Sequence, residues 1–222
     1  MPARRPALVV MGTSGHAREV IAIAKDADTH RLLGCIGPLR TLETERLPVP
    51  WLGDDDWLEA AGPEVAYVIG IGSGRLRAQL DCAVSRSGRS AAVLVHRRAA
   101  VDPSARLGSG VVIWPGAVIT TDVVAGRHVH VNANASIGHD AVLGDHATLL
   151  PGCTVGGSTR IGAAATICAG ASVIEGLVVG DGATVGAGAV VVRDVPDGAV
   201  VVGVPARPLR RSPLTRRVQC RE

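Results

Sequence analysis

The chain has 222 residues, with 28 glycines, no phenylalanine and a formal net charge of +3 at pH 7. That length allows one or two domains, and the charge is too small to indicate a nucleic-acid partner. No stretch approaches the roughly 18 apolar residues that cross a bilayer, residues 1–11 lack a signal-peptide pattern, and the five cysteines form no CxxC pair. We therefore expect a cytoplasmic protein with reduced thiols that binds neither nucleic acid nor a membrane.

The first hundred residues alternate apolar runs typical of strands with segments of helical periodicity. Strands are predicted at residues 7–11, 31–36, 65–71 and 91–95, and helices at residues 55–61 and 75–85. A further helix is predicted around residues 16–24, because Val20, Ile21 and Ala24 fall on one helical face. This alternation is typical of a small parallel α/β sheet.

A glycine-rich turn, Gly12 to His16, connects the first strand to its helix. Backbone N–H groups at the start of a helix attract anions, so the turn indicates a phosphate site, although a turn that is merely tight explains the glycines equally well. The spacing is GxxG rather than GxGxxG, and Gly37 and Pro38 stand where an acidic residue would follow the second strand. Both departures disfavour NAD. His16 is either part of this site or a surface histidine.

From Val101 onward one pattern recurs every six residues. Fifteen of the sixteen key positions are branched aliphatics: Val101, Leu107, Ile113, Ile119, Ala125, Val131, Ile137, Leu143, Leu149, Val155, Ile161, Ile167, Val173, Val179, Val185 and Val191. Six is a multiple of the strand period of two and not of the helical 3.6, so the backbone must be extended. The repeat predicts a parallel β-helix of just over five coils, roughly 25 Å tall, with the aliphatic row inside it.

Four of the seven histidines interrupt this apolar repeat within nineteen residues: His128, His130, His139 and His146. His128 and His146 are eighteen residues apart, so they should stack in adjacent coils at about 4.8 Å. Two stacked imidazoles could hold a metal, but no two histidines have the five-residue spacing found in zinc hydratases built on a β-helix. We expect an outward-facing histidine ladder and no metal.

Four segments together resemble one family: GTSGHAREV after the first strand, IGIGSGRLR, NANASIGHDAVLGDHATLLPG within the repeats, and the closing GVPARPL. They are similar to the sugar O- and N-acyltransferases of the NeuD and PglD type. The resemblance implies a Rossmann-like acceptor-binding domain (1–98), a left-handed β-helix (99–203) and a basic C-terminal tail (204–222). It also implies a homotrimer that transfers an acetyl group from acetyl-CoA to an amine on a nucleotide-linked sugar, at sites between subunits.

The resemblance assigns catalysis to two neighbouring residues in the IGHDAV segment. His139 matches the catalytic base, which removes a proton as the amine attacks the thioester, and imidazole suits this task because it titrates near neutral pH. Asp140 matches the acidic position that strengthens the base, since a neighbouring carboxylate stabilises imidazolium. From its place in the repeat alone, His139 could equally be a solvated corner residue.

The resemblance also implies binding residues for both substrates. The positions that match the acceptor pocket are Ser14, Gly15, His16 and Gly72, and those that match the acetyl-CoA site are Thr148, Gly157, Ala169, Ala187 and Arg207. Two positions depart from the family. Thr148 stands where a histidine that touches acetyl-CoA is common, and Gly37–Pro38 replaces an aspartate pair that grips the nucleotide.

Two alternatives remain open at the level of sequence. The same base could acylate a sugar hydroxyl, which the residues do not distinguish from an amine. A trimeric scaffold or ligand-binding protein without catalysis would also keep the β-helix for assembly, although the His139–Asp140 pair argues against it.

Overall fold

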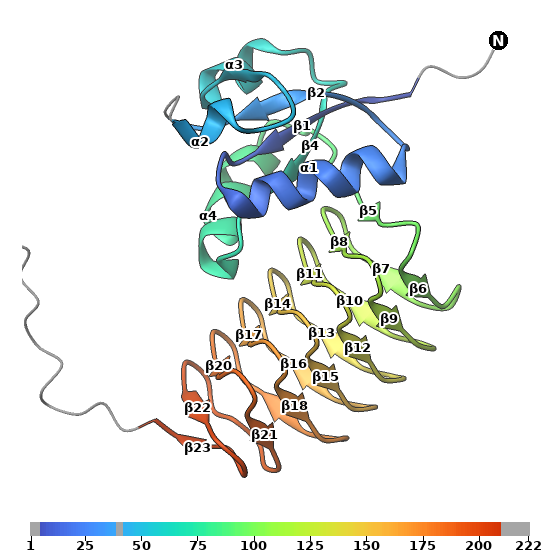
Figure 1. The fold of residues 1–222 in the computed structure, drawn as a ribbon, viewed down its shortest axis with the longest axis vertical. Helices are drawn as coiled ribbons and strands as arrows, with labels where there is room; N and C mark the ends of the chain where they lie inside the picture. Colours follow the sequence, from blue (N-terminus) through green and yellow to red (C-terminus); the bar gives the residue numbers. More distant parts are fainter. Residues whose placement is uncertain (1–4, 39–41, 210–222) are drawn as a thin grey trace, which may run out of the picture.

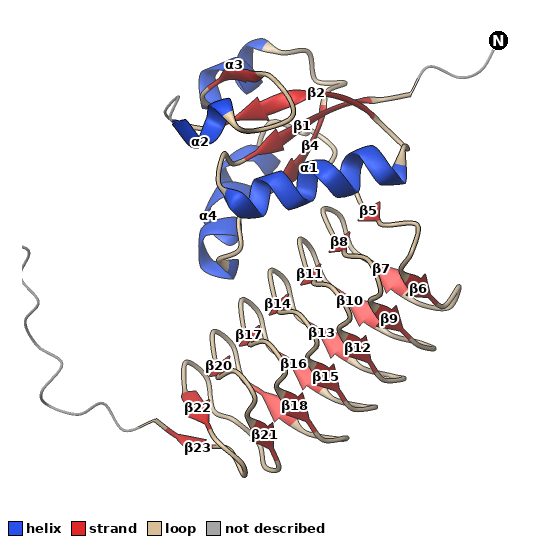
Figure 2. Ribbon diagram, viewed as in Figure 1, coloured by secondary structure: helices blue, strands red, loops and turns tan. Residues whose placement is uncertain are grey.

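A computed structural model describes residues 5–38 and 42–209, except for the side chains of residues 42 and 43. The chain forms an α/β unit that rests on one side of a stack of short strands (Figure 1). All the helices of the described residues belong to the first unit, whereas the stack consists of strands and turns (Figure 2). The expected basic tail, residues 204–222, is described only as far as residue 209.

The first unit is a four-stranded parallel sheet with the strand order β3-β2-β1-β4. Its strands are β1 (Ala7–Met11), β2 (Arg31–Ile36), β3 (Trp51–Gly53) and β4 (Ala66–Ile69), and its helices are α1 (Gly15–Ala27), α2 (Leu42–Glu45), α3 (Asp55–Ala60) and α4 (Gly74–Ser85). The central strands are apolar along nearly their whole length because helices cover both faces of the sheet. Side chains of α1 pack on one face, and those of α3 and α4 on the other.

Most of the predicted elements of this unit are confirmed within one or two residues. The prediction of one strand over residues 91–95 is wrong. Ala91 forms a single bridge with Tyr67 of β4, whereas Leu94 and Val95 form β5 and pair with Val112 and Ile113 of the second unit. The segment therefore leaves one sheet and enters another, so pairing in the β-helix starts before residue 99. The sequence analysis also missed α2 and β3, which are only four and three residues long.

The second unit is a β-helix of very short strands, which pair in parallel except for the last, which runs antiparallel to its neighbour. They are β5 (Leu94–Val95), β6 (Ala100–Val101), β7 (Arg106–Leu107), β8 (Val112–Ile113), β9 (Val118–Ile119), β10 (Val124–Ala125), β11 (His130–Val131), β12 (Ser136–Ile137), β13 (Val142–Leu143), β14 (Thr148–Leu149), β15 (Thr154–Val155), β16 (Arg160–Ile161), β17 (Thr166–Ile167), β18 (Ser172–Val173), β19 (Val178–Val179), β20 (Thr184–Val185), β21 (Val190–Val191), β22 (Val200–Val202) and β23 (Arg207–Pro208). They assemble into three sheets of five, six and eight strands, one for each wall of a triangular prism.

The register confirms the six-residue repeat. Val131 pairs with Leu149 and Leu149 with Ile167, so each coil takes eighteen residues and the predicted aliphatic row fills the interior. Each coil turns three corners, and from Gly110 to Gly188 every corner has a residue in the left-handed region, such as Asp122 with φ 57° and Asn134 with φ 56°. The pattern ends after β21, where Val179 bridges Val195, which is only sixteen residues further on.

The α/β unit packs on the wall formed by the eight-stranded sheet, which we call the docking wall. Helix α1 lies between the first sheet and this wall (Figure 1), and Leu94, Val112 and Trp114 belong to the same apolar core as the inner side of α1. The outward-facing positions of the wall are consequently buried as far as Thr148, whereas Val118 and Val178, which have the same place in the repeat on the other walls, are 40% and 42% exposed.

The turns between the three walls lie along three edges of the prism, which we call corners. The near corner (residues 127–128, 145–146 and 163–164) and the third corner (133–134, 151–152, 169–170 and 187–188) border the docking wall. The far corner (121–122, 139–140 and 157–158) joins the other two walls and therefore lies opposite the α/β unit. None of the helices in the described ranges is long and apolar enough to cross a membrane.

Candidate active site

The far corner holds the histidine that the sequence analysis selected. His139 follows β12 and precedes Asp140, whose φ of 58° turns the chain into the next wall. His139 Nδ1 lies 2.7 Å from Asp140 Oδ2, and both side chains are largely exposed. If Nδ1 carries the proton and donates it to the carboxylate, Nε2 keeps its lone pair and is free to accept a proton from a substrate.

Gly157 occupies the same corner one coil further on. A methyl group at Gly157 would lie 2.6 Å from His139 Nε2, which is closer than van der Waals contact allows. The backbone N–H of Ser158 donates to the carbonyl of His139 at 2.7 Å and fixes the two coils to each other. The absence of a side chain at Gly157 therefore leaves the space that the imidazole fills.

Two expected acceptor residues lie at the start of α1. Ser14 and Gly15 line a cavity of about 150 Å³, and the Ser14 side chain makes no capping hydrogen bond to the helix. Arg18 and Arg46 border the same cavity and are exposed. Free N–H groups at a helix start, together with two guanidinium groups, suit a phosphate.

His16 contacts the docking wall. Its Nε2 lies 3.0 Å from His130 Nδ1, and its ring packs against Trp114 and close to Gly72. Burial, and secondarily the charge of Arg77, lowers the pKa of His16 to about 4, so the ring is neutral at physiological pH.

Thr148 is 1% exposed and lies inside the same contact. Its hydroxyl accepts a hydrogen bond from Arg77 Nη2 at 2.9 Å and donates one to the carbonyl oxygen of Gly72 at 3.2 Å. The expected contact between Thr148 and CoA stays a prediction, which this enclosed position does not favour. Two of the residues expected at the acceptor site, His16 and Gly72, thus lie next to this expected donor residue.

The remaining donor residues lie elsewhere in the chain. Ala169 and Ala187 are exposed at the third corner, and Arg207 is exposed in β23 at the end of the β-helix. Within one chain, neither corner residue shares an edge of the prism with His139. The structure therefore brings His139, Asp140 and Gly157 together. Ala169, Ala187 and Arg207 lie apart from that group.

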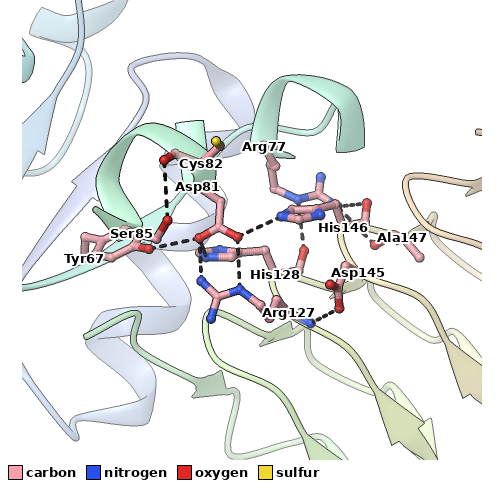
Figure 3. Close-up of polar contacts among 10 residues, drawn as sticks. All are labelled: Tyr67, Arg77, Asp81, Cys82, Ser85, Arg127, His128, Asp145, His146 and Ala147. Atoms are coloured by element: carbon pink, nitrogen blue, oxygen red, sulfur yellow. Dashed lines mark hydrogen bonds and ion pairs between the residues drawn. The ribbon is translucent and has the colours of Figure 1, made fainter. Parts of the chain in front are cut away.

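A buried carboxylate at the near corner was missed by the sequence analysis (Figure 3). Asp81 of α4 accepts hydrogen bonds from Tyr67 at 3.1 Å, from His128 Nε2 at 3.1 Å and from His146 Nε2 at 3.0 Å. Arg127 adds two more, from Nε at 3.1 Å and from Nη2 at 2.6 Å. Burial would raise the pKa of Asp81, but these donors, Arg127 foremost, lower it to about 2.

The histidine ladder is confirmed as an outward-facing stack, but it lies under α4 and not in solvent. The rings of His128 and His146 are parallel within 5°, with centroids 5.8 Å apart. The side chain of His128 is fully buried and that of His146 is 13% exposed, because α4 covers both. Burial foremost lowers the pKa of His128 to about 4. Within the described ranges, no group of three or more histidine, cysteine or acidic side chains could hold a metal ion.

Arg77 on α4 is the second residue that the sequence analysis missed. It is fully buried and donates only to backbone carbonyls and the Thr148 hydroxyl. The available signal was spacing: Gly74, Arg77 and Asp81 fall on one helical face, which packs inward despite its charges. A charged pair four residues apart on a helix is ordinarily solvated, so this pattern by itself would not have revealed the contact.

Comparisons with known proteins identify the family to which the chain belongs. Residues 7–82 match the family model of the PglD N-terminal domain. PerB from Caulobacter crescentus, solved with CoA and GDP-perosamine, is 34% identical with a TM-score of 0.84, and the match covers 92% of this chain and 97% of PerB. The acetyltransferase domain of PglB from Neisseria gonorrhoeae is 33% identical with a TM-score of 0.87, covering 92% and 100%. No curated protein sequence matches the chain.

WeeI from Acinetobacter baumannii has the same fold, with 26% identity and a TM-score of 0.75 over 91% of this chain and 99% of WeeI. The PglB acetyltransferase domain has also been solved with acetyl-CoA. These matches and the β-helix define an acetyl-CoA-dependent sugar acetyltransferase. The chain belongs to the hexapeptide-repeat sugar acetyltransferase family that includes PerB and the PglB acetyltransferase domain. The expected resemblance, the left-handed β-helix after a Rossmann-like unit, and the use of acetyl-CoA are confirmed.

Proposed function

We propose that this protein transfers the acetyl group of acetyl-CoA to the amine of a nucleotide-linked amino sugar, with His139 as general base. The observation that carries the proposal is the exposed His139–Asp140 pair, in which Nδ1 is held 2.7 Å from a carboxylate oxygen. Asp140 orients the ring and stabilises the imidazolium that forms. Two variants of perosamine N-acetyltransferase from Caulobacter crescentus, with one histidine replaced by asparagine or alanine, have been solved in complex with CoA and GDP-perosamine.

The chemistry needs one proton to be moved twice. The sugar nitrogen attacks the thioester carbonyl, and His139 Nε2 takes the proton that the nitrogen loses. When the tetrahedral intermediate collapses, the C–S bond breaks and the proton passes from the imidazolium to the CoA sulfur. The products are an N-acetylated sugar and CoA, and no acyl group is attached to the protein.

The acceptor site in this proposal spans the carboxyl ends of the first sheet, where ligands of open parallel sheets bind. The cavity at Ser14 and Gly15 suits a diphosphate because of its helix start and its two arginines. A second, mostly apolar cavity of about 290 Å³, which Gly37 and Pro38 help to line, suits a nucleobase. GDP-perosamine bound to PerB is an acceptor of this chemical kind.

The site further requires a second copy of the chain, and we propose a homotrimer. Ser14, Gly15 and His16 lie on the side of the docking wall, whereas His139 lies at the far corner, on the opposite edge of the prism. One chain therefore cannot bring its own base to its own acceptor. CoA would lie between neighbouring β-helices, with Gly157 from one copy facing the Ala169–Ala187 edge of the next, and Arg207 would meet CoA phosphates.

The test is the turnover of His139→Ala with acetyl-CoA and a panel of amino sugars and their nucleotide derivatives. Loss of the general base should lower kcat at least about a hundredfold while the oligomer stays intact. CoA release and the mass of the product report the reaction, and resistance of the product to mild alkali separates an amide from an ester. His30→Ala, in the loop before β2, is the matched control and should leave turnover unchanged.

Three outcomes contradict the proposal. A kcat of His139→Ala within a few fold of the wild type removes the assigned base. Acetylation of acceptors that lack the amine favours O-acetylation, and release of no CoA with any amino sugar removes the acceptor class.

A further inference from the structure

Arg77 is a buried charge without an acidic partner in the described part of the chain. It is fully buried in α4, and burial lowers its pKa to about 9, so it remains charged at neutral pH. Asp81, one turn further along the same helix, is instead engaged by Tyr67, Arg127 and two histidines. Burying a charge lowers the stability of the fold unless its donors are hydrogen-bonded. The acceptors of Arg77 therefore show which segments this side chain connects.

The guanidinium joins the two units of the chain. Nη1 donates to the carbonyls of Ile71 at 3.0 Å and Gly72 at 2.9 Å, both in the loop between β4 and α4. The other two nitrogens donate to the β-helix: Nε to His128 O at 3.0 Å, and Nη2 to His146 O at 2.7 Å, Ala147 O at 3.0 Å and Thr148 Oγ1 at 2.9 Å. One side chain thus ties this loop to two successive coils.

The loop that Arg77 holds, residues 70–73, is the acceptor loop of the proposed function. Gly72 lies beside the ring of His16, and its carbonyl also accepts a hydrogen bond from Thr148. The residue after the loop is Gly74, the first of α4, where a methyl group would lie 2.4 Å from the carbonyl oxygen of His146. The loop therefore rests directly on the backbone of the β-helix.

We propose that Arg77 is a positioning residue for the acceptor, which fixes the acceptor loop on the β-helix so that the sugar amine meets the base of another subunit. The inference rests on the proposed function. In an assembly in which acceptor and base come from different copies, the angle between the α/β unit and its own β-helix sets the distance between them. A displacement of about 1 Å is enough to slow a bimolecular transfer strongly.

The test compares Arg77→Met with Arg89→Met. Arg89 is a matched control, because its guanidinium likewise donates to several backbone carbonyls. All of these carbonyls, such as those of Leu58 and Ala61, lie within the α/β unit. Arg77→Met should lower kcat at least tenfold and leave the KM for acetyl-CoA within twofold. Amide hydrogen exchange in residues 70–73 should accelerate at least tenfold, and Arg77→Lys should recover part of both losses.

Arg89→Met should lower the thermal midpoint while kcat and the exchange of the acceptor loop stay within twofold of the wild type. A kcat of Arg77→Met within twofold of the wild type overturns the proposal, as does an equal loss of kcat in Arg89→Met. If the wild type acetylates no amino sugar, the proposed function fails on its own. Hydrogen exchange then tests whether Arg77 holds the acceptor loop on the β-helix. Unchanged exchange of residues 70–73 in Arg77→Met would overturn that role.

Thr148→Val provides a second variant in case Arg77→Met does not fold. It keeps the shape of the side chain and removes the hydroxyl between Arg77 and the Gly72 carbonyl. We expect kcat to fall three- to tenfold with an unchanged KM for acetyl-CoA. A raised KM for acetyl-CoA with normal kcat would instead place Thr148 at the donor and overturn the inference.

Discussion

A single missing methyl group sets the geometry of the proposed base. His139 lies over Gly157 so closely that any side chain there would meet Nε2, the atom that must accept the proton. The backbone of Gly157 does not itself need glycine, because its φ lies outside the left-handed region in which other glycines of the corners fall. Glycine at this position is therefore explained by the imidazole and not by the turn.

Gly157→Ala should consequently lower activity much more than stability. The new methyl group forces the imidazole away from its place, and we expect kcat to fall at least tenfold while the thermal midpoint changes by only a few degrees. Steady-state kinetics and a melting curve measure the two effects. Gly182→Ala is the control: nothing lies within 4 Å of its added methyl group, and its φ of 62° is close to the 53° that Ala164 adopts at the same corner one coil earlier.

The control should behave in the opposite way. Left-handed backbone costs an alanine about 1–2 kcal/mol, so Gly182→Ala should be somewhat less stable and fully active. Normal turnover in Gly157→Ala would contradict the role given to His139 Nε2.

The contact between α4, α1 and the docking wall is a polar seam in which three histidines are kept neutral. His16 and His128 have a pKa lowered to about 4, and that of His130 is lowered well below 6.5, in each case chiefly by burial. The charged and titratable groups around them are Tyr67, Arg77, Asp81, Arg127 and His146. The unfolded chain therefore binds more protons than the folded chain between about pH 4 and 6.5.

This difference predicts that stability rises with pH through that window and is lost on acidification. Each unit of pKa difference is worth about 1.4 kcal/mol, so the thermal midpoint should fall steeply as pH is lowered from 6.5 towards 4. Asp81 contributes in a lower window, because its stabilisation is complete above pH 3.8 and is lost only as pH falls towards about 2. Calorimetry over a pH series measures both.

His16→Gln is the matched variant for this prediction. Glutamine can still hydrogen-bond to His130 but does not titrate, so the fall of the thermal midpoint between pH 6.5 and 4 should become shallower. A midpoint that is independent of pH between 7 and 5 in the wild type would show that these histidines are not buried neutral.

For the whole molecule, the decisive relation is that the α/β unit and the far corner lie on opposite sides of one prism. If the site is completed by another copy, then two inactive variants should complement each other. His139→Ala keeps an intact acceptor side, and His16→Ala keeps an intact base. Mixed oligomers should regain about a quarter of the wild-type rate, since one in four random pairings of acceptor side and base is intact.

Activity after coexpression or after denaturation and refolding of a 1:1 mixture measures this complementation. The control mixture contains His139→Ala and the double variant, in which no pairing supplies a base, and it should stay inactive. A mixture of the two single variants that is no more active than either alone would mean that each chain forms its site by itself.

The sequence predicted some of the site because the repeat fixes direction. His139 comes two residues after Ile137, and that position faces outward at a corner, as the structure confirms. The same reasoning predicts the outward direction of His128 correctly but not its burial. A side chain that points out of the β-helix meets solvent at the far corner and α4 at the near corner. Nothing in a local window distinguishes these two cases.

The amino-acid sequence alone predicts the β-helix, its register and which positions face outward. Residues six apart share a face only in an extended chain, and hexapeptide repeats are typical of a β-helix with three walls per coil. Only the tertiary structure decided which wall the α/β unit covers, and with it the burial of Arg77, Asp81 and the histidines. The three walls repeat one pattern, so they differ only in whether the α/β unit docks on them. The contacts that decide this join residues 47 and 51 positions apart in the sequence.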